Sequence, residues 1–348
     1  MMAREAPMRS LLKALACAVT FFATAAHGAR AQEPFANKTI TMVVGSSAAG
    51  SYDIAARLLA RHMGRHIPGA PTMIVRNMPG GGGLTAAAYL YNRAARDGTE
   101  IGALSRTLPI LPLFGEGRDL FDPLKFGWIG SSVNVVGAAV SWRSSGVKTI
   151  HDAMQKELIL GGTGPGSQAN VYPLAMNNII GTKFKVVSGY PGSAEVIMAM
   201  ERGEVEGFGS WSWSAMEKGG YLHAQKLNVL VQLGLQKHPD HPDVPLVLDL
   251  AQNKGDRDVL ELIFAPQTFA RPIAAPPGVP AATLDTLRSA FGAALGDREL
   301  LDEAERLKLE VGLVSGAELE GLIHRLYSSS PQIIQRASQA VGGALKAD

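Results

Sequence analysis

The chain has 348 residues, of which 46% are hydrophobic, and its 33 Lys and Arg against 31 Asp and Glu give a formal net charge of +2. This composition excludes a disordered chain, which would be less hydrophobic and more charged, and the single cysteine excludes a disulfide scaffold. Near-balanced charge without any run of five or more Lys and Arg also argues against a nucleic-acid partner. At roughly 150 residues per domain, the length indicates two domains.

Residues 1–31 have the pattern of a secretory signal peptide. Basic residues stand near its start, residues 11–26 are almost wholly apolar, and the Ala-Arg-Ala of residues 29–31 fits a cleavage site. The apolar run is shorter than the roughly 20 residues needed to cross a bilayer. We therefore expect export with removal of residues 1–31. Four basic residues and one acidic residue leave with this leader, so the net charge changes from +2 to −1.

The first part of the mature chain alternates predicted strands and helices. Residues 38–44 form an apolar, β-branched run typical of a buried strand, and the small residues at 45–51 predict a turn. Apolar residues at helical spacing then predict an amphipathic helix over 52–66. The same order returns in a strand at 73–76, a glycine turn at 79–83, a helix at 84–95 and a strand at 99–104.

A second series begins with a predicted strand at 135–142. It continues with strands at 158–160, 185–187, 205–209 and 227–233, glycine turns at 161–167 and 188–192, and helices from 168 and over 193–202. Four prolines between 272 and 280 indicate a linker or a domain crossing before a helical region from 283. Alternating elements predict parallel sheets covered by helices, arranged as two lobes with a cleft between them.

Three glycine-rich turns each join a strand to a helix. Right-handed crossovers place such turns at the carboxyl edge of a parallel sheet, where ligands bind in open α/β folds. Free N–H groups at a helix start attract anions, and glycine allows close backbone approach. Charge-assisted hydrogen bonds contribute about 1.5–3 kcal/mol each, so a few amides suffice for micromolar binding of a small carboxylate. The alternative is that the glycines only form tight turns.

A secreted serine hydrolase is an alternative function. Residues 45–49 (Gly-Ser-Ser-Ala-Ala) approach the G-x-S-x-G nucleophile elbow between a strand and a helix, with Ser47 as the nucleophile and His324 as a possible base. Against this function, Ala49 replaces the second glycine and no acidic third member of a triad stands out.

Nucleotide and metal sites are weakly indicated. The glycine run at 80–83 lacks the G-x-G-x-x-G spacing, and no G-K-[ST] follows any turn. His62 and His66 are four residues apart on one predicted helix, as metal ligands often are. Because Arg61 and Arg65 adjoin them, we interpret this side of the helix as an exposed polar face.

Short motifs in a fixed order carry a family resemblance. They are Gly50-Ser51-Tyr52-Asp53, Asn77-Met78-Pro79 with four glycines, Asp97-Gly98-Thr99, Gly164-x-Gly166-Ser167, Tyr190-x-Gly192, Pro242-Asp243-Val244-Pro245 and Ala275-Pro276-Pro277-Gly278. Together with the leader, and over nearly all of the mature chain, they resemble the periplasmic solute receptors of tripartite tricarboxylate transporters, the Bug family.

The resemblance implies an α/β, two-lobed periplasmic-binding-protein fold of the Venus flytrap type II class with a central cleft. Residues 32–138 and 271–348 would form lobe 1, and residues 139–270 lobe 2. The resemblance further implies a monomeric, periplasmic solute-binding protein that is not an enzyme and has no catalytic residues, metal or cofactor. The protein would capture a small organic carboxylate for the membrane subunits of a tripartite tricarboxylate-type transporter. A ligand-sensing periplasmic module is a further alternative.

The resemblance also implies which residues of this chain bind the ligand. In lobe 1 they are Ser46, Ser47, Ala49, Gly50, Ser51, Asp53, Gly82, Gly83, Thr85, Ser105 and Arg106, and in lobe 2 they are Thr163, Gly164, Gly166, Ser167, Tyr190, Gly192 and Ser210.

Several positions depart from the family pattern. The usual proline and phenylalanine after the first strand are Gly45 and Ser46, Ala48 and Ala49 replace a proline and a glycine, Tyr52 replaces a threonine, Asn170 replaces a frequent histidine, and Arg106 replaces a small polar residue. We therefore expect an altered pocket in lobe 1, whose ligand need not be a typical family dicarboxylate.

Overall fold

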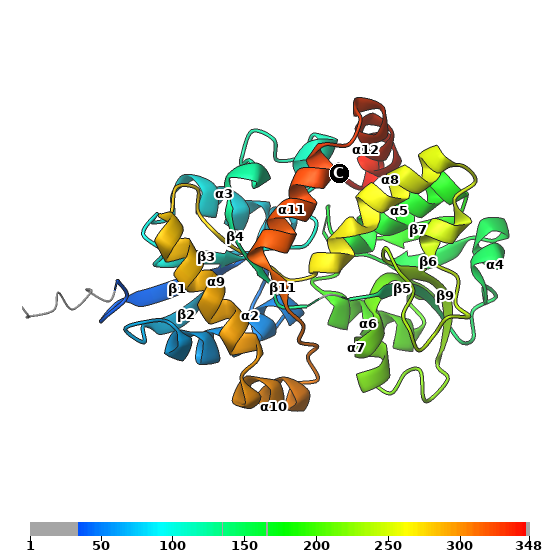
Figure 1. Cartoon of the computed structure of the whole chain (residues 1–348). Helices are drawn as coiled ribbons and strands as arrows, with labels where there is room; N and C mark the ends of the chain where they lie inside the picture. The colour runs from blue at the N-terminus through cyan, green and yellow to red at the C-terminus, as the bar shows by residue number, and fades with distance from the viewer. Residues whose placement is uncertain (1–33, 134, 165, 346–348) are drawn as a thin grey trace, which may run out of the picture.

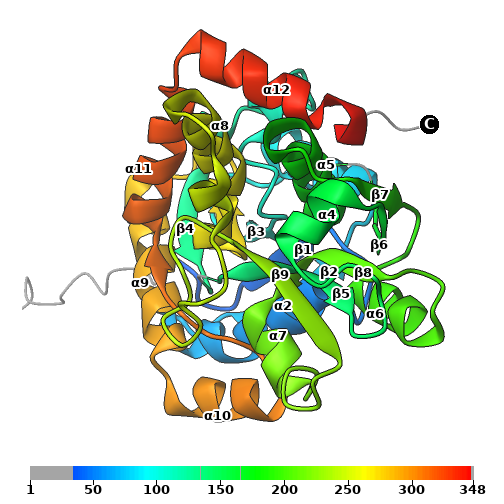
Figure 2. The ribbon, with the colours of Figure 1, turned by 90° about the vertical axis from the view of Figure 1, so that its right-hand side faces the viewer.

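The computed structural model describes residues 34–133, 135–164 and 166–345, so the predicted leader lies outside the described residues. Two separate sheets, each covered by helices, form two lobes (Figure 1, Figure 2). The strand order is β11-β4-β10-β3-β1-β2 in one sheet and β7-β6-β8-β5-β9 in the other. The predicted two-lobed α/β fold is therefore confirmed.

The sheet of lobe 1 is built from both parts of the chain. Its strands are β1 (Thr39–Val44), β2 (Thr72–Asn77), β3 (Glu100–Ala103), β4 (Gly127–Ser131), β10 (Pro272–Ala275) and β11 (Val314–Ser315). The first three are mutually parallel, whereas β10 runs antiparallel between β3 and β4. The proline-rich stretch therefore starts with a central strand and is no flexible linker, and Pro272 stands at the first position of that strand, where a missing N–H is tolerated.

The helices of lobe 1 pack against this sheet, except for α10, which packs on α2 and α9. They are α2 (Ser51–Met63), α3 (Leu84–Asn92), α9 (Ala281–Leu295), α10 (Arg298–Arg306) and α11 (Gly316–Tyr327). Leu59 and Met63 of α2 share a buried cluster with Phe291 of α9. The predicted helix over 52–66 is confirmed, and its last residues form a short 3-10 turn, η1 (Gly64–His66).

The sheet of lobe 2 is continuous in sequence. Its strands are β5 (Gly137–Trp142), β6 (Leu158–Gly161), β7 (Phe184–Val187), β8 (Gly207–Ser212) and β9 (Leu227–Leu233), and its helices are α4 (Ile150–Gln155), α5 (Gln168–Ile180), α6 (Ser193–Arg202), α7 (Trp213–Lys218) and α8 (Lys254–Phe264). β6 is parallel to β7 and β8, but β5 is antiparallel to β8 and β9. The prediction of wholly parallel sheets is wrong, because β5, β10 and β11 run antiparallel to their neighbours.

The C-terminal helix α12 (Pro331–Leu345) contacts both lobes (Figure 2). Its Arg336 pairs with Asp256 of α8, and its Ala340 carbonyl accepts a 2.8 Å bond from Asn178 of α5. On the side of lobe 1, Ser338 Oγ donates to the main-chain carbonyl of Phe114, the last residue of the 3-10 helix η3 (Leu111–Phe114). We keep the boundaries near residues 138 and 271 as a proposal, with α12 as a helix of lobe 1 that packs on lobe 2.

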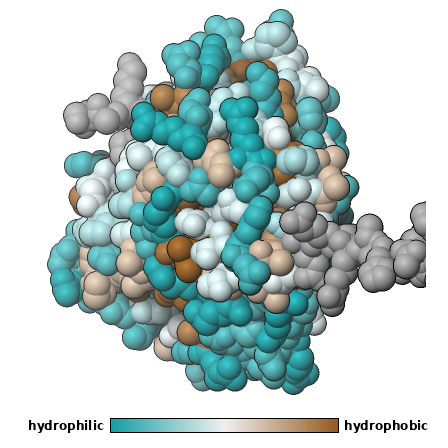
Figure 3. All heavy atoms as spheres, turned by 90° about the vertical axis from the view of Figure 1, so that its left-hand side faces the viewer, coloured by the Kyte–Doolittle hydropathy of each residue, from teal (hydrophilic) through white to brown (hydrophobic). Residues whose placement is uncertain are grey.

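The surface of lobe 1 is mainly hydrophilic on the side seen in Figure 3, with small, separate hydrophobic areas. Within residues 34–133, 135–164 and 166–345, no helix combines the length and apolar character needed to cross a bilayer.

The charged side of α2 is a contact surface for α10. Arg65 Nη2 lies 2.6 Å and His66 Nε2 2.8 Å from Asp297 Oδ2, and His62 Nε2 lies 2.6 Å from Glu303 Oε2. His62 is only 7% exposed. The interpretation as an exposed polar face is therefore wrong for His62, which Glu303 covers from 241 positions away, whereas Arg61 and Arg65 remain exposed and His66 is partly exposed.

This contact also contains three metal-ligand types in proximity. Ligand atoms of His62, Asp297 and Glu299 lie within 4.8 Å of one another. Arg65 donates to both carboxylates and contacts His62 Nδ1 at 2.9 Å. The Arg65 guanidinium thus already contacts all three side chains that could bind a metal ion. We therefore interpret the cluster as an ion-pair network between helices.

We expect acid to weaken the contact between α2 and α10. Burial raises the pKa of Asp297, but bonds from His66, the Glu299 amide and Arg65 more than offset this and hold the pKa at about 2. A carboxylate with a lowered folded pKa adds stability that is present above its ordinary pKa of about 4 and is lost as the pH falls toward the folded value. Asp297→Asn should therefore lower the Tm at pH 7, and its difference from wild type should shrink as the pH falls from about 4 to about 2.

Glu305→Gln is the matched control, because Glu305 is an exposed acid of the same helix outside this network. It should leave the Tm close to that of wild type throughout the same pH series. Equal Tm values for wild type and Asp297→Asn at pH 7 would show that the network adds no stability.

Candidate ligand-binding site

The carboxylate of Asp53 organises the turn after β1. Its Oδ2 accepts bonds from Ala49 N at 2.8 Å and Arg57 Nε at 3.0 Å, and its Oδ1 accepts one from Asn77 Nδ2 at 2.8 Å. Burial raises the pKa of Asp53, but these donors more than offset it, so the pKa lies below its ordinary value. Asp53, a predicted ligand contact, is thus bonded within lobe 1, and its charge already occupies the positive end of α2.

Three turns of lobe 1 lie side by side. A Cβ placed on Gly45 would come within 3.0 Å of Gly83 Cα, and a Cβ on Gly83 would lie 3.7 Å from Ser105 Cβ. All four glycines of 80–83 have positive φ, which explains why this turn needs glycine. The structure therefore brings together the predicted positions on the turn after β1 and those at Gly82, Gly83, Thr85, Ser105 and Arg106.

Hydrogen bonds join the two predicted turns of lobe 2. Thr163 Oγ1 donates to Ser167 Oγ at 2.8 Å, and Ser167 Oγ donates to Asn170 Oδ1 at 3.3 Å. Asn170 Nδ2 donates to Ser188 Oγ at 2.6 Å, and Gly189 N donates to Thr163 O at 3.3 Å. The predicted residues of these turns are therefore connected through Asn170. Ser188 was not predicted, although its place in a Ser-Gly-Tyr-Pro-Gly turn was a usable signal.

The remaining predicted residues of lobe 2 lie on or beside these turns. Gly164 and Gly166 are in the first turn, and Tyr190 and Gly192 are in the second. Ser210 is on β8, and its buried hydroxyl has no hydrogen-bond partner among the described residues. Its free donor is compatible with a ligand contact.

Arg106 connects lobe 1 to the segment through which the chain returns from lobe 2. Its Nη1 donates to Oε1 of Gln267, a residue of η6 (Ala265–Phe269) that is 1% exposed. Its backbone N and Nε donate to Tyr52 Oη at 3.3 and 3.4 Å, and Tyr52 Oη donates to Ala270 O at 3.0 Å. Arg106 therefore points into the junction of the lobes, which we define as the region where Tyr52 and Arg106 contact Gln267 and Ala270.

A second arginine, Arg271, stands at the same junction. Its Nη1 donates to Glu310 O at 3.3 Å, and its backbone N donates to Ser131 Oγ at 3.1 Å. Burial lowers the pKa of Arg271; the Tyr52 phenol opposes this effect and the charge of Arg106 reinforces it. The Glu310 charge acts on both arginines, but among the residues described no carboxylate lies within ion-pair distance of either one. The junction thus holds two guanidinium groups that have no ion-pair partner within the described part of the chain.

Two phenols lie in the field of these charges. Burial raises the pKa of Tyr52, but the charge of Arg106 and its hydrogen bonds lower it overall. Tyr172 of α5 is 0% exposed, its ring packs 4.6 Å from that of Phe264, and its hydroxyl has no partner in the part of the chain that the structure describes. Burial raises the pKa of Tyr172 despite the charge of Arg106, so this phenol remains a neutral donor.

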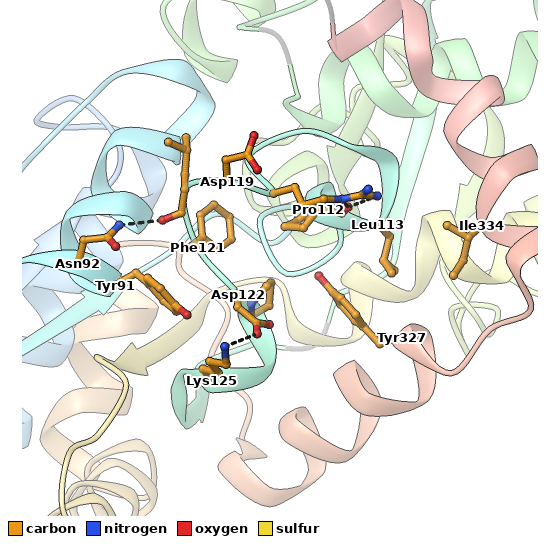
Figure 4. A pocket seen from close by; sticks show the side chains of 13 residues that line it. Tyr91, Asn92, Pro112, Leu113, Asp119, Phe121, Asp122, Lys125, Tyr327 and Ile334 are labelled. Carbon is orange, nitrogen blue, oxygen red and sulfur yellow. Dashed lines mark hydrogen bonds and ion pairs between the residues drawn. The ribbon is translucent and has the colours of Figure 1, made fainter.

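Two cavities differ in their relation to the junction. One of about 10 Å³, bordered by Tyr52, Ser132 and Arg271, has room for about one water molecule. A larger one of about 540 Å³ lies among α3, α11, α12 and η4 (Pro123–Lys125), where the Tyr327 ring points inward (Figure 4). In that cavity Lys125 pairs with Asp122 at 3.3 Å and Arg118 donates to a main-chain carbonyl. Asp119 and Asp122 also line that cavity and balance the charges of Arg118 and Lys125, whereas no carboxylate pairs with Arg106 or Arg271 among the described residues, so we place the candidate site at the lobe junction.

The structure does not bring together the catalytic residues that the serine hydrolase alternative requires. Ser47 is exposed, and its main-chain carbonyl accepts a bond from Gly50 N. His324 is exposed on α11, and no hydrogen bond joins it to Ser47 within the described ranges. The nucleophile and the base of this alternative are therefore not assembled.

Comparison with known proteins gives one curated relative and several similar structures. No family model matches the chain. A UPF0065 protein from the gbd 5' region of Cupriavidus necator is 28% identical over 251 residues, which cover 68% of this chain and 72% of that protein. The periplasmic binding protein BugD superposes with a TM-score of 0.66 at 19% identity, over 87% of this chain and 97% of BugD.

Two structures from Rhodopseudomonas palustris contain bound acids. A protein with adipate matches with a TM-score of 0.64 at 19% identity, over 86% of this chain and 97% of that one. MatC with malate matches with a TM-score of 0.62 at 18% identity, over 85% of this chain and 99% of MatC. The chain has the fold of Bug-type periplasmic solute-binding proteins. The fold that the resemblance implied is thereby confirmed, and the curated relative agrees with the resemblance.

The first turn differs from the Bug pattern at a strained position. Ala49 has a φ of 64°, in the left-handed region where the family has glycine. An L-residue there costs roughly 1–2 kcal/mol, and the greater flexibility of unfolded glycine offsets about 0.5–1 kcal/mol of that. Ala49→Gly should therefore stabilise the protein by about 0.5–1 kcal/mol in urea unfolding.

Ala48→Gly is the control, because Ala48 is in the same turn and does not have a positive φ. It should destabilise the protein. If both substitutions lower the free energy of unfolding equally, Ala49 is not strained.

Proposed function

We propose that this protein is a periplasmic solute-binding protein, without enzymatic activity, that captures a small organic carboxylate between its lobes. It delivers the ligand to the membrane subunits of a tripartite tricarboxylate-type transporter and acts as a monomer. The fold likeness to proteins that hold adipate and malate supports the transport role. The predicted leader supports export to the periplasm.

One observation carries the choice of an acidic ligand. Arg106 and Arg271 meet at the lobe junction with no carboxylate within ion-pair distance among residues 34–133, 135–164 and 166–345. A charge removed from water is costly unless it is paired, so an anion that enters the junction gains from both guanidinium groups. A neutral or cationic ligand would gain nothing from these charges.

Binding requires the lobes to move. The cavity beside Tyr52 and Arg271 has room for about one water molecule, which is far too little for an organic acid. We therefore propose a hinge at the chain crossings near residues 138 and 271 that opens to admit the ligand and closes over it. Ligand binding then shifts the equilibrium between an open and a closed state.

A thermal-shift measurement on the mature protein tests this function. Adipate, malate and citrate are compared with adipamide and malamide, which keep the size but lose the charge. A ligand at 100 times its Kd adds about 2.7 kcal/mol of stability. We expect at least one of the acids to raise the Tm while its amide does not. A rise with the amides alone, or no rise with any acid, would contradict the proposal.

A further inference from the structure

Arg106 retains hydrogen-bond donors that its own contacts do not use. A guanidinium has five N–H donors and no acceptor. Nε bonds to Tyr52 and one N–H of Nη1 bonds to Gln267, which leaves one N–H on Nη1 and two on Nη2 without a partner among the described residues. The edge formed by Nη1 and Nη2 is a binding edge for bidentate carboxylates. An anion can therefore bind Arg106 without displacing either contact.

Gln267 fixes this guanidinium where the two chain crossings meet. Its main-chain carbonyl accepts a 3.2 Å bond from Val135 N on the outgoing crossing. A Cβ on Gly137 would lie 2.8 Å from Gln267 Nε2, so the amide packs closely against the start of β5. Arg106 is thus held in place before a ligand arrives, which reduces the entropy that binding loses.

The hydroxyl of Tyr172 supplies a second free donor from the other lobe. It is fully buried, lacks a partner in the part of the chain that the structure describes, and lies within range of the charge of Arg106. A buried hydroxyl without a hydrogen bond is costly, so an acceptor at this point is favoured. Arg106 of lobe 1 and Tyr172 of α5 in lobe 2 therefore each offer an unused donor.

We infer that Arg106 binds a carboxylate of the ligand by a direct ion pair, that the Tyr172 hydroxyl donates to the same ligand group, and that this contact selects the acid over its neutral analogue. The inference rests on the proposed function and adds to it a specificity residue. The ligand is then an organic acid with at least one carboxylate bound at the lobe junction, beside the chain crossings near residues 138 and 271. The turns of the two lobes bind the remainder of the ligand.

Calorimetric titration of wild type and Arg106→Gln with adipate and adipamide, and with malate and malamide, tests the inference. A charge-assisted contact contributes about 1.5–3 kcal/mol, which corresponds to a factor of roughly 10 to 100 in affinity. We expect Arg106→Gln to weaken binding of the acid by this factor and to leave binding of its amide unchanged. Arg106→Lys should recover only part of the loss, because lysine keeps the charge but not the bidentate edge.

Arg118→Gln is the matched control, because Arg118 carries the same charge on lobe 1 but bonds a main-chain carbonyl in the cavity away from the junction. It should bind the acids as wild type does. Equal losses for acid and amide in Arg106→Gln, or no loss for the acid, would overturn the inference while leaving the proposed function intact. Failure of wild type to bind any acid would overturn the proposed function itself.

Tyr172→Phe keeps the inference testable if Arg106→Gln does not fold. It removes one hydroxyl and preserves the ring that packs on Phe264. We expect this variant to lose several-fold in affinity for the acid, with an unchanged or raised Tm, because the hydroxyl has no partner among the described residues. Unchanged affinity for the acid would contradict the role of Tyr172.

Discussion

The guanidinium of Arg106 joins the two lobes without a carboxylate partner among the described residues, and the geometry of the junction depends on it. Charged groups are removed from water only at a large free-energy cost unless an opposite charge or strong hydrogen bonds replace the water. Here neutral groups, the Gln267 amide and the Tyr52 phenol, provide the hydrogen bonds. They hold the cation in place without neutralising it, which leaves its charge available to an anion.

This arrangement changes which feature would explain the proposed binding of an anion. Helix starts and glycine turns attract anions in general, but the start of α2 already has Asp53 within hydrogen bonds of Ala49 and Arg57. Arg106 and Arg271 have no such acid within ion-pair distance among the residues described. The positive charge at the junction therefore comes from two side chains, while in the proposed site the turns would contribute shape and hydrogen bonds.

The junction also connects binding to the movement of the lobes. Arg106 extends from lobe 1 after β3, Gln267 precedes the returning strand β10, and Tyr172 belongs to α5 of lobe 2. A carboxylate bound by Arg106 and Tyr172 would complete contacts between the lobes that exist only in the closed form. Such differential contacts are what a ligand needs in order to favour closure.

The local elements were predictable from the sequence because their signals are local. The apolar spacing that predicted a helix over 52–66 and the glycine turns before α3 and α6 depend on neighbouring residues. The role of Arg106 was open because its partner is 161 positions away, and His62 was misread because Glu303 is 241 positions away. β10 was missed because its prolines resemble a linker, although an antiparallel strand can begin with proline.

A crystal structure of the mature protein with the acid that stabilises it most tests the central claim most directly. We expect one ligand carboxylate at the lobe junction, with its oxygens about 2.7–2.9 Å from Arg106 Nη1 and Nη2. A ligand in the cavity between α3 and α11, or a carboxylate at the junction that contacts neither Arg106 nor Arg271, would contradict the account.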